Sequence, residues 1–246
     1  MKPPFCRSGN KTPLLKQIDS IIPVHKIFVE PFVGSGAVYF NRPLIAEKAV
    51  INDLDKDLIT GYRLLKKGVK GKPLPKTLEE QRAYYAKPAK TDTDKLLHLI
   101  LKFCNTFSNV GKGNLYKNPT HEKKIADFPV YTEYLKDTTI LNEDYKKVIK
   151  KYDSKDTFFF LDPPYEDSQK KNLYDTNANL NYEELLDAVK GIKGMFLLTL
   201  NDSKYIRDLF KDYIIEPVKI KGYNNAVNRI GSKDRKELFI RNYKSN

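Results

Sequence analysis

The chain of 246 residues alternates between short apolar runs and longer amphipathic segments. Compact apolar runs bounded by polar or glycine-containing segments predict buried strands, here at residues 26–30, 48–55, 138–142, 158–160, 194–200, 214–220 and 237–242. Apolar residues at helical spacing predict helices at residues 57–67, 78–85, 95–103, 182–189 and 203–210. This alternation predicts an α/β fold with a mainly parallel sheet and helices on both faces.

The segment between residues 56 and 137 has a different character, because its helical patterns are separated by joints that contain glycine and proline, such as residues 68–75. We therefore expect a helical subdomain at residues 56–137, inserted into a larger domain of residues 1–55 and 138–246.

The composition of the chain indicates a nucleic-acid partner. The chain has 44 Lys and Arg against 31 Asp and Glu, a formal net charge of +13 and a pI of about 9.4. Such an excess favours phosphate binding, although a lysine-rich chain can also reflect an AT-rich genome. The polar, basic stretch at residues 224–236 is a predicted DNA contact, with Asn228, Arg229 and Lys233 as its candidate residues.

Several classes of protein are disfavoured. Cys6 and Cys104 are too few for a disulfide framework, and three scattered histidines show no metal-ligand spacing. No apolar stretch has the length of a membrane span, and no signal peptide is visible. We expect a soluble intracellular protein that uses no metal and binds no membrane.

The first chemical motif is the sequence Asp162-Pro163-Pro164-Tyr165, which directly follows the apolar run 158–160. The Asp162 carboxylate can accept one N–H of an exocyclic amine, and the Pro163 carbonyl, aimed by the rigid prolines, can accept the other. Tyr165 offers a flat face to the ring that carries the amine. The motif fits a nucleobase amine, although the same residues also form ordinary turns at strand ends.

The second motif is a glycine loop after the first strand, with Glu30, Phe32, Gly34, Ser35 and Gly36 as candidate ligand contacts. The glycines let the backbone turn tightly against a ligand, and we expect a helix to follow them. Because Tyr39 breaks the G-x-G-x-x-G pattern, a dinucleotide pyrophosphate is not the expected ligand. The chain also has no G-x-x-x-x-G-K-[ST] loop, which disfavours nucleotide hydrolysis.

A third candidate is Asp53, at the end of the second strand and 17 residues beyond Gly36. An acid in this position of an α/β fold commonly binds ribose hydroxyls. The alternative is that Asp53 caps the helix at residues 57–67, since Asp is a favoured N-cap.

Taken in order, these motifs resemble those of the Dam-type family (D12 class, α group) of S-adenosylmethionine-dependent DNA adenine-N6 methyltransferases. The resemblance begins at residues 8–15, a Gly-x-Lys segment, continues through the three motifs above, and ends near residues 237–239. It implies a Rossmann-like class I methyltransferase sheet, with residues 56–137 as the target-recognition domain. It also implies methyl transfer from S-adenosylmethionine to a flipped-out adenine in duplex DNA.

The resemblance also implies individual roles. Lys11 lies near the cofactor's methionine carboxylate, Asp53 binds its ribose, and Phe32 lines the floor between the two ligands. Asp144 meets the cofactor's adenine amine and Tyr145 packs on that ring, while Asp162 and Tyr165 take the target adenine, Asp162 lying close to the cofactor too. Arg7 is a departure, because the family usually has an aromatic residue there.

Residues 103–114 resemble the start and exit of the family's DNA-reading hairpin. The stretch 109–113 is shorter than the family's and lacks its arginines, so the resemblance does not assure the usual GATC specificity. The candidate DNA contacts are Asn105, Ser108, Asn109, Lys112 and Asn114, together with Tyr174 in the polar stretch 166–181. Ordinary loop residues are the alternative for this set.

Two rival functions remain open, a ribosomal guanine-N2 RNA methyltransferase and a catalytically silent DNA-binding relative. The sequence leaves the recognition site, a cognate restriction endonuclease and the oligomeric state undetermined.

Overall fold

The computed structural model describes residues 1–41, 46–106, 114–116, 118, 121–165, 180–220 and 235–244. These residues form a seven-stranded sheet in the order β3-β2-β1-β4-β5-β7-β6. The strands are β1 (Ile27–Glu30), β2 (Lys48–Asn52), β3 (Thr139–Leu141), β4 (Thr157–Leu161), β5 (Met195–Asn201), β6 (Ile214–Ile220) and β7 (Arg235–Arg241). Six of them coincide closely with the predicted strands, and β2 begins as predicted at Lys48 but ends at Asn52, before the acids that the prediction included.

The pairing confirms a mainly parallel sheet. The pairs β1–β4, β4–β5 and β2–β3 are parallel, whereas β7 runs antiparallel to both β5 and β6. Strand β4 is buried along its whole length, with Phe158, Phe159 and Leu161 fully inaccessible. A central parallel strand is covered on both faces, and this explains why its sequence is a continuous apolar run rather than an alternation.

The chain divides into two compact units. Unit 1 comprises Met1–Lys11, Val33–Arg42 and Val50–Glu143, and unit 2 comprises Thr12–Phe32, Pro43–Ala49 and Asp144–Asn246. Unit 1 contains the whole predicted insert but extends beyond it. Because compactness does not show which residues recognise DNA, the predicted domain boundaries stay a prediction.

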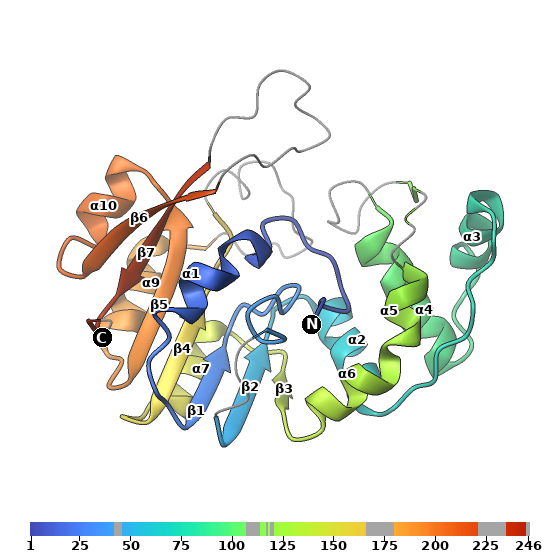
Figure 1. Ribbon diagram of the computed structural model, residues 1–246, viewed down its shortest axis with the longest axis horizontal. Helices are drawn as coiled ribbons and strands as arrows, with labels where there is room; N and C mark the ends of the chain where they lie inside the picture. The colour runs from blue at the N-terminus through green and yellow to red at the C-terminus, as the bar shows by residue number, and fades with distance from the viewer. Residues whose placement is uncertain are drawn as a thin grey trace. The chain divides into compact units, whose positions relative to one another are not determined.

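Unit 1 is mainly helical, with α2 packed against both α4 and α6 (Figure 1). Its helices are α2 (Lys56–Lys66), α3 (Leu78–Tyr85), α4 (Asp92–Cys104), α5 (His121–Ala126) and α6 (Phe128–Leu135). The three predicted helices of the insert are confirmed. Helix α4 begins earlier than its apolar pattern does, because the Thr91 side chain caps it by accepting the N–H of Asp94.

The first seven residues run over the helices of unit 1 and are held along their length. The hydroxyl of Tyr131 donates to the Lys2 carbonyl at 2.9 Å. Phe5 is buried and makes edge-on contacts with Tyr62, at 5.0 Å between ring centroids, and with Phe103, at 5.8 Å. These contacts set the backbone position from which Arg7 and Lys11 extend.

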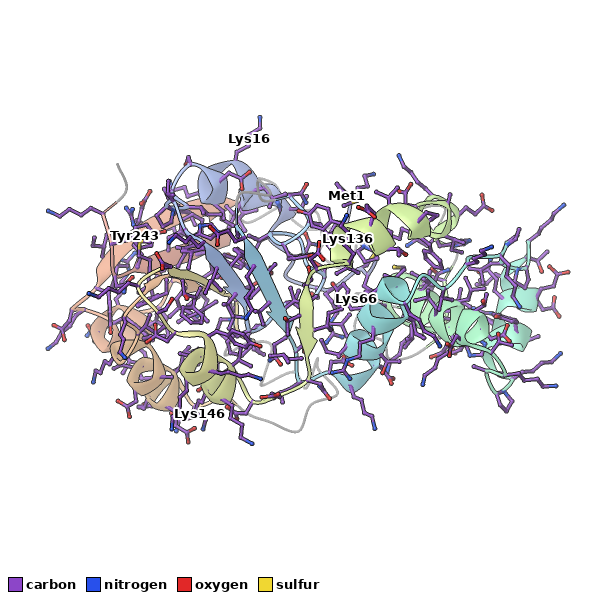
Figure 2. The ribbon with its side chains drawn as sticks, turned by 90° about the horizontal axis from the view of Figure 1, so that it is seen from below. Met1, Lys16, Lys66, Lys136, Lys146 and Tyr243 are labelled. Atoms are coloured by element: carbon purple, nitrogen blue, oxygen red, sulfur yellow. The ribbon has the colours of Figure 1, made fainter. Side chains whose placement is uncertain are left out.

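Unit 2 places helices on both sides of its strands. Its helical elements are η1 (Thr12–Leu14), α1 (Leu15–Asp19), α7 (Tyr145–Tyr152), α9 (Tyr182–Lys190) and α10 (Lys204–Leu209). Figure 2 shows Lys16 of α1 and Lys146 of α7 on opposite sides of the strands. The prediction of helices on both faces of the sheet is therefore confirmed.

The helix expected after Gly36 is wrong for the residues that the structure describes. Residues 37–41 form turns, with one helix-like bond from the Phe40 N–H to the Gly36 carbonyl at 2.9 Å. The side chain of Asn41 donates to the Ala37 carbonyl, also at 2.9 Å. Pro43 follows two residues later, and a residue before proline is disfavoured in helical geometry. Residues 42–45 lie outside the described part of the chain.

Within the described ranges, no helix combines the length and the apolar character that a membrane crossing requires.

Candidate active site

The glycine loop of unit 1 depends on two residues with positive φ, Gly34 at +47° and Gly36 at +73°. The N–H of Gly36 donates to the Val33 carbonyl at 2.7 Å, and the Tyr62 hydroxyl donates to the Gly34 carbonyl at 2.9 Å. A Cβ added at Gly36 would lie 2.9 Å from the Phe40 ring, whereas one added at Gly34 would meet nothing within 4 Å. The loop therefore packs tightly at Gly36 and faces open space at Gly34.

Asp53 is bonded to this loop. Its Oδ2 accepts the N–H of Gly34 at 2.9 Å, and its Oδ1 accepts the N–H of Asp55 at 3.0 Å. The alternative that Asp53 caps α2 is wrong, because Asp55 does so by accepting the N–H groups of Asp57 and Leu58, both at 3.1 Å. Asp53 is thus available for the ligand role that its position predicted.

The strand ends around Asp53 are joined by amide side chains. Asn52 and Glu143 exchange two hydrogen bonds, from Asn52 Nδ2 to the Glu143 carbonyl at 2.9 Å and from the Glu143 N–H to Asn52 Oδ1 at 2.8 Å. Asn142 Nδ2 donates to the Asp53 carbonyl at 2.7 Å. These bonds hold the carboxyl ends of β2 and β3 together. Sequence analysis did not single out Asn52 or Asn142 for this role.

Arg7, which stands where the family usually has an aromatic residue, forms a buried ion pair. Its guanidinium lies 2.9 Å from Asp55 Oδ2, and both side chains are only 7% exposed. The same guanidinium lies 5.1 Å from the centre of the Phe103 ring, a favourable cation–π distance. Arg7 therefore holds Asp55, which caps α2 and whose N–H also donates to Asp53.

The electrostatics of Asp53 follow from this arrangement. Burial raises the pKa of Asp53, while the Arg7 charge and the N–H groups of Asp55 and Gly34 lower it. The nearby Asp55 carboxylate adds a smaller upward effect on that pKa. Arg7 is the cation in this group that favours an ionised Asp53, the form that accepts hydroxyl hydrogens.

Lys11 and Ser35 complete the candidate residues of unit 1. Lys11 is 3% exposed and its ammonium donates to the Gly9 carbonyl at 2.9 Å. Gly9 has a φ of +80°, which lets this short segment curl back on the lysine. Ser35 is also buried, between the two glycines of the loop.

Unit 2 brings together Tyr145, predicted to pack on the cofactor's adenine, and Phe32, predicted to line the floor between the two ligands. The rings of Phe32 and Tyr145 lie 5.1 Å apart between centroids. Asp144 Oδ1 accepts the N–H of Lys146 at 2.8 Å and so caps α7, which fixes the turn that presents Tyr145. Glu30, at the end of β1, is 2% exposed.

The Asp-Pro-Pro-Tyr motif follows β4 and is held by three further side chains of unit 2. Thr199 Oγ1 donates to Asp162 Oδ1 at 2.8 Å, and the Tyr165 hydroxyl donates to Glu237 Oε2 at 3.0 Å. The Tyr182 hydroxyl donates to the Pro164 carbonyl at 3.0 Å. The motif is therefore held in place by hydrogen bonds to three side chains.

Sequence analysis did not assign roles to Thr199, Glu237 or Tyr182. A signal was present for two of them, because Thr199 is a polar residue inside the apolar strand β5 and Glu237 is a carboxylate inside β7. Polar groups buried in strands require hydrogen-bond partners, so such positions point to a network.

Most predicted DNA contacts lie outside the described residues: Ser108, Asn109, Lys112, Tyr174, Asn228, Arg229 and Lys233. Asn114 is exposed, and its neighbour Leu115 forms an antiparallel bridge with Thr106 at the base of the predicted hairpin. Asn105 is 2% exposed, with its Nδ2 atom 3.5 Å from His121 Nδ1. In this structure its side chain is buried at the end of α4 and does not lie on the surface.

Among the residues that the structure describes, no group of three or more His, Cys, Asp or Glu side chains could hold a metal ion.

The glycine loop supports a stability prediction. Gly36→Ala should lower the free energy of unfolding by more than the roughly 1–2 kcal/mol that left-handed backbone costs an alanine, because the new methyl group also displaces the Phe40 ring. Gly34→Ala is the matched control, since it has a positive φ but open space. Urea denaturation of both variants checks the difference. Equal losses would mean that packing around Gly36 is not tight.

The sequence is similar to known DNA methyltransferases. The family described as D12 class N6 adenine-specific DNA methyltransferase matches residues 8–102 and 104–222. The type II methyltransferase M1.LlaDCHI of Lactococcus lactis subsp. cremoris is 28% identical over 284 residues, covering 98% of this chain and 95% of the relative. The type II methyltransferase M.CviBI of Paramecium bursaria Chlorella virus NC1A is 28% identical over 264 residues, covering 99% of this chain and all of the relative (100%).

A DNA adenine methylase of Haemophilus influenzae is 25% identical over 249 residues, covering 89% of this chain and 86% of the relative. The family match includes the glycine loop, the Asp53 segment and the Asp-Pro-Pro-Tyr motif. The chain belongs to the D12 class of N6 adenine-specific DNA methyltransferases.

Proposed function

We propose that this adenine-specific DNA methyltransferase takes its methyl group from S-adenosylmethionine and delivers it to an adenine flipped out of duplex DNA. The observation that carries the proposal is the Asp162 carboxylate, held at the end of β4 by the Thr199 hydroxyl at 2.8 Å, in the same motif as Tyr165.

The target amine is a poor nucleophile, because its lone pair is delocalised into the adenine ring. In the proposed mechanism Asp162 accepts one amine hydrogen and the Pro163 carbonyl accepts the other, which concentrates charge on the nitrogen as the new bond forms. An oxygen that is already fixed by the protein needs little reorganisation to do this. The same contacts place the nitrogen for in-line attack on the sulfonium methyl group that the cofactor supplies.

Tyr165 would hold the ring of the target base. Extracting a base from the duplex costs a few kcal/mol, and stacking on an aromatic side chain returns roughly 1–3 kcal/mol. Pro164 keeps the tyrosine close to the carboxylate, and the Tyr182 bond to its carbonyl supports that position.

The candidate cofactor residues suit S-adenosylmethionine in their chemistry. A carboxylate has about four acceptor positions, so Asp53 can accept ribose hydroxyls as well as its two backbone N–H groups. The aromatic pair Phe32 and Tyr145 suits the cofactor's adenine ring, with Asp144 at its amine. Lys11 suits the methionine carboxylate, and Arg7, Glu30 and the loop Gly34-Ser35-Gly36 complete the proposed set.

Duplex DNA as the partner is supported by the formal net charge of +13. We propose that residues 56–137 form the recognition domain and that residues 1–55 and 138–246 form the catalytic domain. Asn114 is an exposed member of the predicted DNA contacts and is the described residue to mutate first.

Incubation with radiolabelled S-adenosylmethionine and unmethylated duplex DNA, with total RNA in parallel, tests the proposal. Digestion to nucleosides should place the label in N6-methyldeoxyadenosine. Label in RNA alone would support a ribosomal guanine-N2 RNA methyltransferase instead. Failure to bind the cofactor would indicate a catalytically silent DNA-binding relative. Sequencing of the modified DNA then identifies the recognition site.

A further inference from the structure

We propose that Glu237 and Thr199 are positioning residues for methyl transfer: Glu237 of β7 holds the Tyr165 ring, and Thr199 of β5 holds the Asp162 carboxylate. The inference rests on the proposed function, because it assigns Asp162 and Tyr165 to the target adenine.

Glu237 lies in an environment where a carboxylate is costly. It is 2% exposed and accepts the Tyr165 hydroxyl at 3.0 Å, while Tyr165 itself is 7% exposed. Burying a charged group is strongly unfavourable unless hydrogen bonds compensate it. The bond to Tyr165 is one such compensation, and it joins the last strand of the chain to the motif.

The sheet brings these side chains together from three strands. Leu161, the last residue of β4, pairs with Leu198 of β5, and Asn201 of β5 pairs with Glu237 of β7. Neighbouring strands lie roughly 4.8 Å apart, so side chains at their ends can bond directly. Glu237 and Thr199 lie in strands of the sheet, not in loops, so the groups that hold the motif are themselves held rigidly.

The charges favour a single arrangement of hydrogen bonds. Burial raises the pKa of Tyr165 well above its ordinary value, and the charges of Asp162 and Glu237 raise it further, while a hydrogen bond with Thr199 lowers it by less. The phenol therefore stays protonated and donates to the Glu237 carboxylate, a bond strengthened by the charge. Thr199 correspondingly donates its hydroxyl hydrogen to Asp162 Oδ1, which restricts rotation of the carboxylate.

Both bonds act on how the adenine is held. Loss of the phenol bond frees the Tyr165 ring to tilt, and loss of the Thr199 bond frees the Asp162 carboxylate to rotate. Either change misplaces the amine without removing a group that reacts. The expected result is a lower kcat with little change in cofactor affinity.

The test uses Tyr165→Phe, Glu237→Leu and the double variant, with a duplex carrying 2-aminopurine at the target position. Each single change should lower kcat roughly tenfold, as expected for loss of a hydrogen bond to a charged group. The double variant should be no slower than the slower single variant, because both changes remove the same bond. The 2-aminopurine signal on flipping should change in parallel, and the Kd for S-adenosylhomocysteine should not.

Two further variants keep the test independent of folding. Glu237→Gln retains an acceptor for the phenol and should recover part of the lost kcat. Glu216→Gln changes a carboxylate on the neighbouring strand β6 that pairs with Arg241, and it should leave kcat unchanged. Thr199→Val should lower kcat, and Thr199→Ser should restore it.

Wild-type kcat in Tyr165→Phe would overturn the inference, as would additive losses in the double variant. A wild-type enzyme that puts no label into N6-methyldeoxyadenosine would instead overturn the proposed function, so the two failures are distinguishable.

Discussion

Asp162→Ala should abolish detectable methyl transfer while the protein remains folded. Removing one preorganised group that stabilises developing charge commonly costs 100- to 1,000-fold in kcat, and here the same side chain also orients the amine. The fold should survive because the motif follows β4 rather than forming part of its buried core. Incorporation of labelled methyl groups into duplex DNA measures the loss, and thermal unfolding measures the fold.

Asp187→Ala is the matched control for this prediction. Asp187 is a carboxylate of the same unit, on α9, and its side chain is 77% exposed and 3.7 Å from Lys190. Surface pairs of this kind contribute little to stability, so this variant should keep normal activity. Near-normal turnover by Asp162→Ala would contradict the role given to the motif.

Arg7→Met should lower the free energy of unfolding by about 3–5 kcal/mol, the usual cost of breaking a buried ion pair on one side. The change leaves Asp55 buried without its guanidinium partner, which lies at 2.9 Å in the intact protein. It also removes the cation over the Phe103 ring. Equilibrium denaturation in urea gives the difference from the unmodified protein.

Two variants make the Arg7 result specific. Arg7→Met combined with Asp55→Asn should recover much of the loss, because asparagine is neutral and is also a favoured N-cap for α2. Arg207→Met breaks a less buried pair, in which the arginine is 41% and Asp202 16% exposed at 2.7 Å, and it should cost clearly less than Arg7→Met. Similar losses for Arg7→Met and Arg207→Met would exclude a buried pair at Arg7.

The Arg7 variant should also change the dependence of stability on pH. Burial raises the pKa of Asp53 in the folded state, so its contribution to stability is present at low pH and is lost as pH rises through that pKa. Arg7 lowers this pKa, and its removal raises the pKa further. The stability difference between the two proteins should therefore be larger at about pH 8 than at about pH 5. A difference independent of pH would show that Arg7 does not act on Asp53.

Local sequence patterns determined most of the secondary structure. The strand at residues 214–220 and the helix at residues 78–85 have the predicted bounds, because apolar runs and capping residues act over a few neighbouring positions. The motifs that show the family also lie in short segments. Their order along the chain was enough to indicate a methyltransferase before any contact was known.

Other features depended on partners far away in the sequence. Asp53 and Asp55 are both reasonable caps for α2, and only the structure shows that Asp55 caps the helix while Asp53 accepts the N–H of Gly34, 19 positions away. The turns at residues 37–41 are a different case, because the bonds found in place of the expected helix are local and apolar periodicity does not report them.

The partners of the site residues were likewise decided by the tertiary structure. Arg7 meets Asp55, Asp162 meets Thr199 and Tyr165 meets Glu237, across 48, 37 and 72 positions of the chain respectively. Apolar periodicity indicates that a position is buried but not which polar group will lie beside it. The sequence alone therefore determined the strands, the motifs and the chemistry they imply, while only the fold decided which buried side chains hold that chemistry in place.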